Sequence, residues 1–492
     1  MKRSSGVFLS ISSLPSRYDG IGTLGKEAYK FVDFLSESGF SYWQILPFNP
    51  TGFGNSPYQT FSTFAGNPYY IDLLKLKEEG LLSSYNLKNY TYKKGDFVDY
   101  GLLYIEKFKI LKIAFNKAKK KQKEAFDKFC LENSSWIDDY SLFMAIKDHF
   151  NGCSFLHWPK DIKTRQTKAM KYYKEILKDE VEFYKFTQYA FYKQLKELTD
   201  YMTSKNIELI GDLPIYVSLD SCDVWANTQQ YLFDSEYNPK LVAGVPPDYF
   251  SETGQLWGNP LYNYRRMKKD NYSWWIQRIK HIGKYCKTIR IDHFRGFESF
   301  YAIKNGEKTA VNGRWIKGPG VELFNRIKKE CPDINIIAED LGIITRRVKS
   351  LINECGYPGM KVLQFAFDGS KNNPYLSKNH TPNSVAYIGT HDNQTLKGFT
   401  EELDEEKENY IRKCFRFKEE NIEDLLIKGL FKSKSNLAIV NAVDMLNKDD
   451  TYRMNEPSTI NDKNWAFRLT NLKDLSKLKT KYYRLNKKTE RI

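Results

Sequence analysis

The chain has 492 residues, of which 41% are hydrophobic and 28% are charged, a balance typical of a globular protein rather than a fibrous or disordered one. Lysine and arginine outnumber aspartate and glutamate by 76 to 60, but the excess lies in lysine-rich stretches without a nucleic-acid-binding motif. We interpret it as a solvated surface. No apolar segment approaches the roughly 20 residues that cross a membrane, so we expect neither a nucleic-acid nor a membrane partner.

The seven cysteines are scattered along the chain and form no C-x-x-C pair. This pattern argues against a disulfide framework and a structural zinc site, and it suits a reducing cytoplasm. The apolar run after Gly6 is too short for a signal peptide. We therefore expect a cytoplasmic protein.

Eight short aliphatic runs, several of which end in polar residues, are separated by longer stretches of helical character. Such near-continuous apolar strands are typical of a parallel sheet that is buried on both faces. Eight of them predict an α/β protein whose residues 1–492 form one closed (β/α)8 TIM barrel. The runs are Gly6–Ser10, Tyr42–Leu46, Ile207–Asp212, Thr288–Asp292, Ile334–Asp340, Lys361–Phe367, Val385–Asp392 and Leu437–Asp444.

The uneven spacing of these runs predicts two insertions. About 160 residues separate Leu46 from Ile207, which is far more than one crossover between parallel strands needs. Residues 73–200 read mainly as amphipathic helix, so we expect a helical inserted subdomain there. Residues 218–264 are rich in Gly, Pro, Asp and aromatic residues. We interpret them as a loop-rich insertion that covers the active site.

Three of the predicted strands end in acids, namely Asp292, Glu339 and Asp392. A carboxylate at the carboxyl end of a barrel strand points into the mouth of the barrel, where active sites form. A single acid at such a position could instead cap the following helix. Each of the three is flanked by Arg, by His or by a second acid, and this favours a functional site.

The chemistry of retaining glycoside cleavage accounts for such a set of acids. One carboxylate acts as nucleophile, and a second, whose pKa must be raised, acts first as acid and then as base. Arg290 lies two residues before Asp292, so both side chains face the same side of a strand, which supports Asp292 as nucleophile and Glu339 as acid/base. Asp392 could stabilise the transition state, and His391 could bind a sugar hydroxyl or simply be packed.

These motifs resemble the signature regions of the α-amylase clan. Together with Trp43–Leu73, Gly211–Val217 and Gly244–Tyr262, they resemble amylomaltase, the 4-α-glucanotransferase family known as glycoside hydrolase family 77. The similarity runs from Ser10 to Asn464 and so covers nearly the whole chain. It implies transfer of α-1,4-glucan segments to glucose or another α-glucan, without a metal or other cofactor, and we favour a monomer.

The resemblance also implies which residues form the site. Asp292 would be the nucleophile, Glu339 the acid/base and Asp392 the transition-state stabiliser. A lid over residues 248–257 would exclude water and favour an acceptor sugar. The residues expected to bind substrate are Ser56, Tyr58, Asp212, Phe250, Trp257, Arg290, His391 and Asn464.

Three alternatives remain open. A hydrolase of the same clan would use the same carboxylates and pass the glucan to water. A glucan-binding protein on a degenerate barrel would have lost at least one acid, whereas all three are present. A nucleic-acid-binding protein would show steeply salt-dependent binding to unrelated DNA.

Overall fold

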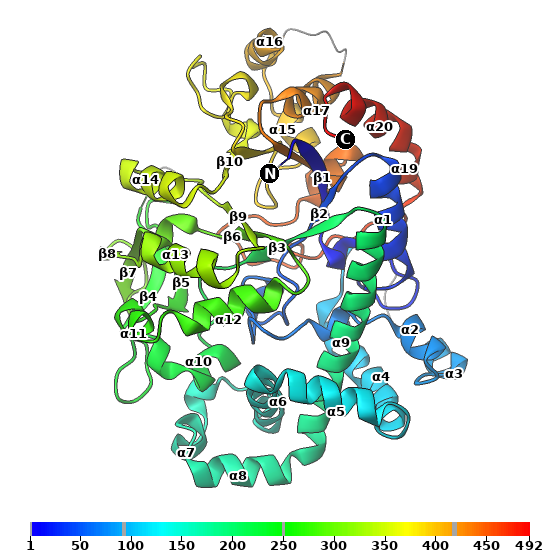
Figure 1. Cartoon of the computed structure of the whole chain (residues 1–492), viewed down its shortest axis with the longest axis vertical. Coiled ribbons are helices and arrows are strands. Elements are labelled where there is room, and N and C mark those ends of the chain that lie inside the picture. The colour runs from blue at the N-terminus through cyan, green and yellow to red at the C-terminus, as the bar shows by residue number, and fades with distance from the viewer. Residues whose placement is uncertain (1, 91–94, 248–250, 416–420) are drawn as a thin grey trace.

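Eight parallel strands form a closed barrel at the centre of the molecule (Figure 1), in the order β1-β12-β11-β10-β9-β6-β3-β2. The structure is a computed structural model that describes residues 2–90, 95–247, 251–415 and 421–492. The barrel strands are β1 (Ser4–Phe8), β2 (Tyr42–Gln44), β3 (Glu208–Leu213), β6 (Thr288–Ile291), β9 (Asn335–Ala338), β10 (Gly359–Val362), β11 (Ser384–Tyr387) and β12 (Leu437–Asn441).

The predicted (β/α)8 barrel is therefore confirmed, and each strand overlaps the run that predicted it. All residues of β1, β6, β11 and β12 are buried, which explains why these strands read as continuous apolar runs. The largest shift is at β10, which begins at Gly359 and ends at Val362. Residues Leu363–Phe365 that follow it form a 3-10 turn instead of extending the strand.

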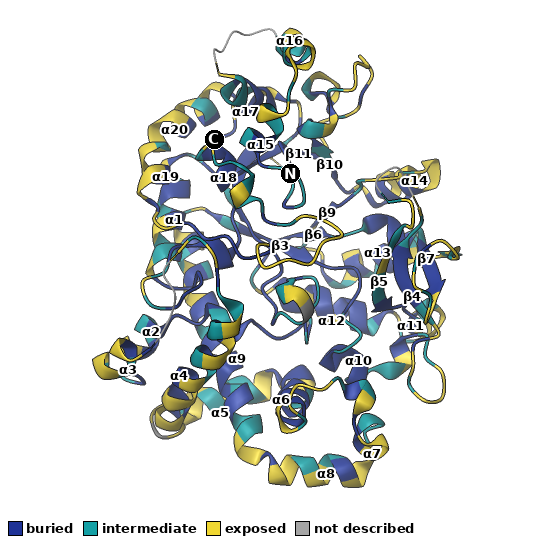
Figure 2. Cartoon of the chain, turned by 180° about the vertical axis from the view of Figure 1, so that it is seen from behind, coloured by how far each residue is buried: buried dark blue, intermediate teal, exposed yellow. Residues whose placement is uncertain are grey.

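Helices cover the outside of the barrel, with buried inner stripes and exposed outer faces (Figure 2). In α14, the buried residues Val348, Leu351, Ile352 and Cys355 follow the spacing of one helix face, and Gly356, at φ 69°, ends the helix. The helices around the barrel are α1 (Lys26–Glu37), α9 (Lys178–Ser204), α12 (Ser273–Ile282), α13 (Val321–Glu330), α14 (Arg346–Cys355), α15 (Leu396–Glu401), α16 (Glu405–Cys414), α17 (Ile422–Lys432), α18 (Ala442–Met445), α19 (Lys473–Lys477) and α20 (Lys479–Lys488).

Between β2 and β3, a group of helices extends the molecule to one side of the barrel (Figure 1). The long helix α9 joins the two parts, because it packs against α6 at one end and leads into β3 at the other. Buried side chains form one continuous core through both parts, in which Phe143 and Trp43 are members of the same cluster. The helices before α9 are α2 (Leu73–Glu78), α3 (Ser84–Lys88), α4 (Tyr100–Lys121), α5 (Lys123–Glu132), α6 (Ser134–His149), α7 (Lys160–Lys163) and α8 (Thr167–Ile176).

Residues 218–264 are not loop throughout, so our interpretation needs a correction. They contain α10 (Cys222–Ala226), β4 (Leu241–Val245) and β5 (Gln255–Pro260), and α11 (Tyr264–Lys269) begins at their end. Strand β4 pairs antiparallel with β5 and with β7 (Ser299–Lys304), and β7 pairs with β8 (Arg314–Lys317), which makes a second sheet of four strands. Glycine and proline within β4 and β5 hid the strand pattern.

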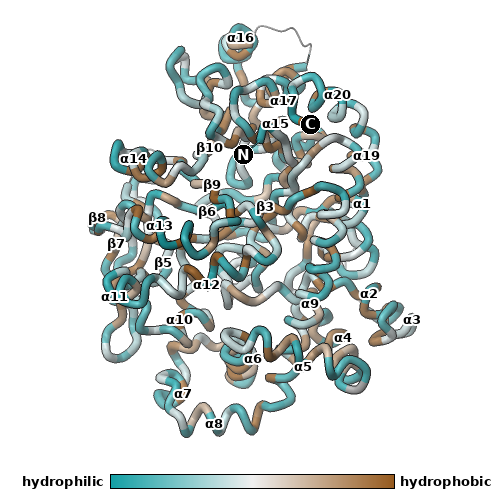
Figure 3. Tube along the Cα trace, viewed as in Figure 1, coloured by the Kyte–Doolittle hydropathy of each residue, from teal (hydrophilic) through white to brown (hydrophobic). Residues whose placement is uncertain are grey.

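Hydrophobic segments gather in the barrel and on the inner sides of the helices, while most of the outer turns are hydrophilic (Figure 3). Among the described residues, no helix combines the length and the apolar character that crossing a membrane requires.

A buried ion pair ties α4 to the N-terminal loop of the barrel. Lys107 and Asp19 are almost fully buried, and the Lys107 Nζ lies 2.6 Å from Asp19 Oδ1 and donates to the Ile71 carbonyl oxygen at 2.6 Å. Burial raises the pKa of Asp19 to about 6, although the Lys107 charge acts to lower it. Removing the lysine would leave a buried carboxyl group without its charged partner.

We predict that Lys107→Ala lowers the free energy of unfolding by about 3–5 kcal/mol at neutral pH, because it leaves an uncompensated buried carboxylate. Asp19 would then bind a proton more readily, so the loss should be larger at pH 8 than at pH 5. Urea unfolding at both pH values measures it. Lys109→Ala, which removes an exposed ion pair with Glu106 on the same helix, is the control and should cost about 0–1 kcal/mol. Equal losses in the two variants would contradict the prediction.

Candidate active site

The carboxyl ends of neighbouring barrel strands bring the predicted acids to one mouth of the barrel. Strand β3 carries Asp212, which lies opposite Arg290 of β6, and Asp292 follows β6 directly. Glu339 follows β9, which pairs with β6, and Asp392 lies a few residues beyond the end of β11. Residues that are far apart in the sequence thus meet because parallel strands end at the same edge.

Arg290 is the centre of the site and is only 4% exposed. Its Nη1 donates to both carboxylate oxygens of Asp212 at 2.8 Å, and its Nη2 donates to Asp292 Oδ1 at 2.9 Å. Burial acts to lower the pKa of Arg290, but the charge of Asp212 and its neighbours raises it well above the usual value. The guanidinium therefore stays charged and holds the two acids in fixed positions.

The two acids beside Arg290 differ in exposure. The Asp212 side chain is 1% exposed and also accepts the Tyr58 hydroxyl at 2.7 Å, whereas the Asp292 side chain is 30% exposed. Burial raises the pKa of Asp212, and the Arg290 charge opposes this. Asp212 is thus an internal partner of the arginine, while Asp292 presents a free oxygen to a ligand in the barrel mouth.

Glu339 is buried, and its carboxylate accepts the backbone N–H groups of His293 at 2.7 Å and Leu341 at 2.8 Å. Burial, together with the charge of Asp292, raises its pKa to about 7. The charge of Arg290 and the two backbone hydrogen bonds act to lower it. Near neutral pH the group is divided between its acid and its base form. This is the state that a general acid/base requires.

The chain makes a strained turn between these two acids. His293 has φ 48° and ψ 51°, a left-handed conformation that costs a non-glycine residue about 1–3 kcal/mol. The turn directs the His293 N–H toward Glu339 and sets its ring against Trp257, with centroids 4.9 Å apart. Burial lowers the pKa of His293 to about 4, so its ring is neutral at pH 7. Trp257 is half-buried, and its role as a substrate-binding residue stays a prediction.

Aromatic rings form the wall between Tyr58 and the third acid. Tyr58 stacks on His391 with centroids 5.3 Å apart, and Trp465 lies 5.8 Å from each of these two rings. The His391 Nε2 is 3.5 Å from Asp392 Oδ1. Trp465 has φ 64° and so adopts a second left-handed conformation at the site. Tyr58 thereby connects the Arg290 network to the residues around Asp392.

Asp392 is the most exposed of the three acids, with 44% of its side chain accessible, and hydrogen bonds from neighbouring residues hold it in place. Asn455 Nδ2 donates to Asp392 Oδ1 at 2.6 Å, and Arg453 Nη2 donates to the Asp392 carbonyl oxygen at 2.6 Å. The Asn455 N–H also donates to the His391 carbonyl oxygen at 3.1 Å. These contacts fix the direction of an otherwise solvated carboxylate.

Sequence reasoning did not assign a role to Asn455 or Arg453. Both lie in an irregular segment far along the chain from Asp392, where no strand end or hydrophobic period marks a functional residue. Trp465 lies within the motif that begins at Asn464, but its ring contacts were not expected.

Two of the expected substrate-binding residues, Ser56 and Asn464, form hydrogen bonds within their own loops, and a third is not described. The Ser56 hydroxyl accepts the Tyr58 N–H at 3.2 Å and so shapes the turn that presents Tyr58. The Asn464 side chain accepts the Glu456 N–H at 3.0 Å and donates to the Thr459 carbonyl oxygen at 3.1 Å, both within its own loop. Phe250 lies outside the described residues. A role in substrate binding stays a prediction for all three.

The arrangement offers two partly exposed carboxylates, a buried acid of raised pKa and several aromatic rings. Within the described ranges, no group of three or more His, Cys, Asp or Glu side chains could hold a metal ion. The carboxylates and the acid of raised pKa can support carboxylate attack combined with proton transfer.

We predict that Asp292→Asn lowers the pKa of Glu339, because it removes the nearby negative charge that disfavours ionisation. A 13C NMR titration of carboxyl-labelled glutamate, with the Glu339 signal identified by its loss in Glu339→Gln, measures this. Asp392→Asn is the control, since Asp392 is not among the main causes of the Glu339 shift and should change it less. An unchanged titration of Glu339 in Asp292→Asn would show that the two acids are not coupled.

Comparisons with known proteins match nearly the whole chain. The model of the 4-alpha-glucanotransferase family matches residues 9–474. A 4-alpha-glucanotransferase of Clostridium butyricum is 47% identical over 97% of this chain and 99% of its own length, and one of Thermus thermophilus is 43% identical over 95% of both. The structure of an amylomaltase from Streptococcus agalactiae in complex with acarbose superimposes with a TM-score of 0.95 and 39% identity, covering 100% of both chains. The chain belongs to the 4-alpha-glucanotransferase family and is a transferase.

Proposed function

We propose that this enzyme transfers α-1,4-glucan segments from a donor glucan to the 4-hydroxyl of glucose or another α-glucan, by a retaining double displacement. Its family membership supports the activity. The observation that carries the mechanism is the pair of unlike acids, a partly exposed Asp292 beside a buried Glu339 whose pKa is raised to about 7. One fold thereby supplies a nucleophile and a proton donor at the same pH.

In the first step, an oxygen of Asp292 attacks the anomeric carbon of the donor sugar. The glycosidic bond breaks, its electron pair goes to the leaving oxygen, and Glu339 gives that oxygen its proton. The products are a glucosyl ester of Asp292 and a shortened glucan with a free 4-hydroxyl. Arg290 holds Asp292 in line through its 2.9 Å hydrogen bond, so the attack needs little reorganisation.

In the second step, Glu339 acts as a base. It takes the proton of the acceptor 4-hydroxyl, the oxygen attacks the anomeric carbon, and the ester bond to Asp292 breaks. The carboxylate and the protonated Glu339 are restored, so the enzyme returns to its starting state. Two inversions at one carbon give net retention of the α configuration.

Asp392 acts on the charge that develops at the anomeric carbon in both steps. Its exposed carboxylate, held by the Asn455 amide, faces the same mouth and can bind sugar hydroxyls more strongly in the transition state. The Tyr58, His391 and Trp465 rings line the wall beside it and suit the C–H-rich face of a pyranose.

Transfer rather than hydrolysis requires that an acceptor sugar reaches the ester before water does. Trp257 stands against His293 beside Asp292 and can hold an acceptor ring there. Residues 251–257 of the expected lid adjoin the second sheet through β5. A bound acceptor has a high effective concentration compared with random encounter, and this favours transfer.

Product analysis with maltotriose tests the proposed reaction. We expect glucose together with a ladder of longer maltooligosaccharides, measured by anion-exchange chromatography. Maltose and glucose without any longer product would instead identify a hydrolase and overturn the proposal.

The same assay tests the nucleophile. Asp292→Asn should lose about 10⁴-fold in turnover, because no glucosyl ester can form. Glu208→Gln is a matched control and should keep near-native turnover, since Glu208 begins β3 at the end of the barrel away from the acids, where it accepts the Thr288 hydroxyl at 2.5 Å. Near-native turnover of Asp292→Asn would remove Asp292 from the role of nucleophile.

A further inference from the structure

A large groove lies outside the barrel mouth, between the N-terminus of α14 and strand β8 of the second sheet. It encloses about 860 Å³, a volume that suits a small-molecule ligand. Figure 1 shows α14 beside β7 and β8 at the edge of this sheet, and Figure 2 shows it beside β7 from behind. None of the acids at the barrel mouth lines it.

The lining of the groove is strongly basic. Arg295, Lys317, Arg346 and Arg347 contribute four positive charges, and Glu298 contributes one negative charge. The Glu298 carboxylate already accepts the Ser299 hydroxyl at 2.6 Å. Within the ranges that the structure describes, none of the four cations forms an ion pair. A concave surface with this excess of charge attracts anions.

The first turn of α14 carries positive charges where helices usually carry negative ones. Thr345 caps the helix by accepting the Val348 N–H at 3.3 Å, but the first two helical residues are Arg346 and Arg347, and the turn contains no acid. Positive charges are disfavoured at the positive end of a helix dipole. The two arginines therefore do not stabilise the helix through its dipole. A bound anion, by contrast, would be stabilised by the helix end and by both guanidinium groups.

Arg295 adds a buried cation with unused hydrogen-bonding capacity. It is 7% exposed, its Nη1 donates to the Ile343 carbonyl oxygen at 2.7 Å, and its Nε has no hydrogen-bond partner among the described residues. Its guanidinium carbon lies 4.0 Å from the centroid of the Trp315 ring. Trp315 itself remains 42% exposed, so a flat apolar surface stands next to the cations.

We propose that this groove binds a sugar that carries a phosphate monoester. The phosphate would bind at the arginines of the first α14 turn, where charge-assisted hydrogen bonds and the helix end act together. The sugar ring would lie on the exposed part of Trp315, because a pyranose face stacks on an aromatic ring. The groove differs from the barrel mouth in charge sign, so it takes an anion and the mouth takes a neutral glucan.

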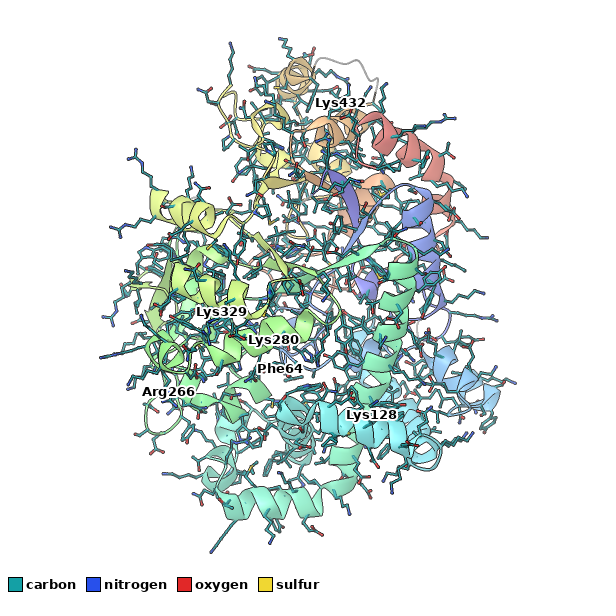
Figure 4. All side chains as sticks on the ribbon, in the orientation of Figure 1. Phe64, Lys128, Arg266, Lys280, Lys329 and Lys432 are labelled. Atoms are coloured by element: carbon teal, nitrogen blue, oxygen red, sulfur yellow. The ribbon has the colours of Figure 1, made fainter. Side chains whose placement is uncertain are left out.

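Isothermal titration of the full-length protein with glucose 6-phosphate tests the site. We expect saturable binding that weakens as NaCl is raised, and a loss of at least about tenfold in affinity in Arg346→Gln/Arg347→Gln. The matched control is Arg265→Gln/Arg266→Gln, which removes two adjacent arginines from the first turn of α11; Figure 4 labels Arg266 there, away from α14. Absence of binding, or equal affinities in the two double variants, would overturn the proposal.

Further titrations show which part of the ligand binds and distinguish the groove from the barrel mouth. Asp292→Asn should bind glucose 6-phosphate as the wild type does, because Asp292 does not line the groove. Glucose at the same concentrations should give no binding that depends on the arginine pair. Inorganic phosphate should bind more weakly than glucose 6-phosphate, and Trp315→Leu should remove that difference. Equal binding of the two phosphates by the wild type would overturn the assignment of a sugar phosphate.

Discussion

The buried guanidinium of Arg290 is the interaction on which the site depends. It joins Asp212 and Asp292 through hydrogen bonds of 2.8 and 2.9 Å while remaining 4% exposed. A charge removed from water in this way is stable only with close partners of opposite sign. The fully buried Asp212 balances it, which leaves the second carboxylate, Asp292, oriented and yet available to a ligand.

The barrel supplies the geometry for this balance. Strands β3, β6 and β9 are neighbours, so Asp212, Arg290 and Glu339 meet without any adjustment of the loops. The left-handed turn at His293 then brings a backbone N–H to Glu339, and this limits how far burial raises the pKa of that acid. Local strain and a buried charge are thus offset by the stability of the surrounding scaffold.

The sequence predicted the barrel and its acids because both follow simple patterns. Buried parallel strands are continuous apolar runs, and Arg290 and Asp292 are two residues apart on one of them. The second sheet escaped prediction because β4 pairs with the distant β7, Val242 opposite Ile303, and glycine interrupts its pattern. Asn455 escaped for a similar reason, since its contact with Asp392 spans 63 residues and leaves no periodic signal.

The pH dependence of kcat/KM for glucan transfer tests the central claim most directly. The free enzyme must hold a proton on Glu339 to donate it, so activity should fall as pH rises through the folded-state pKa of that acid. With a pKa raised to about 7, kcat/KM should decline above neutral pH and keep declining about tenfold for each further pH unit. A value of kcat/KM that stays constant to pH 9, with the fold intact, would contradict the account.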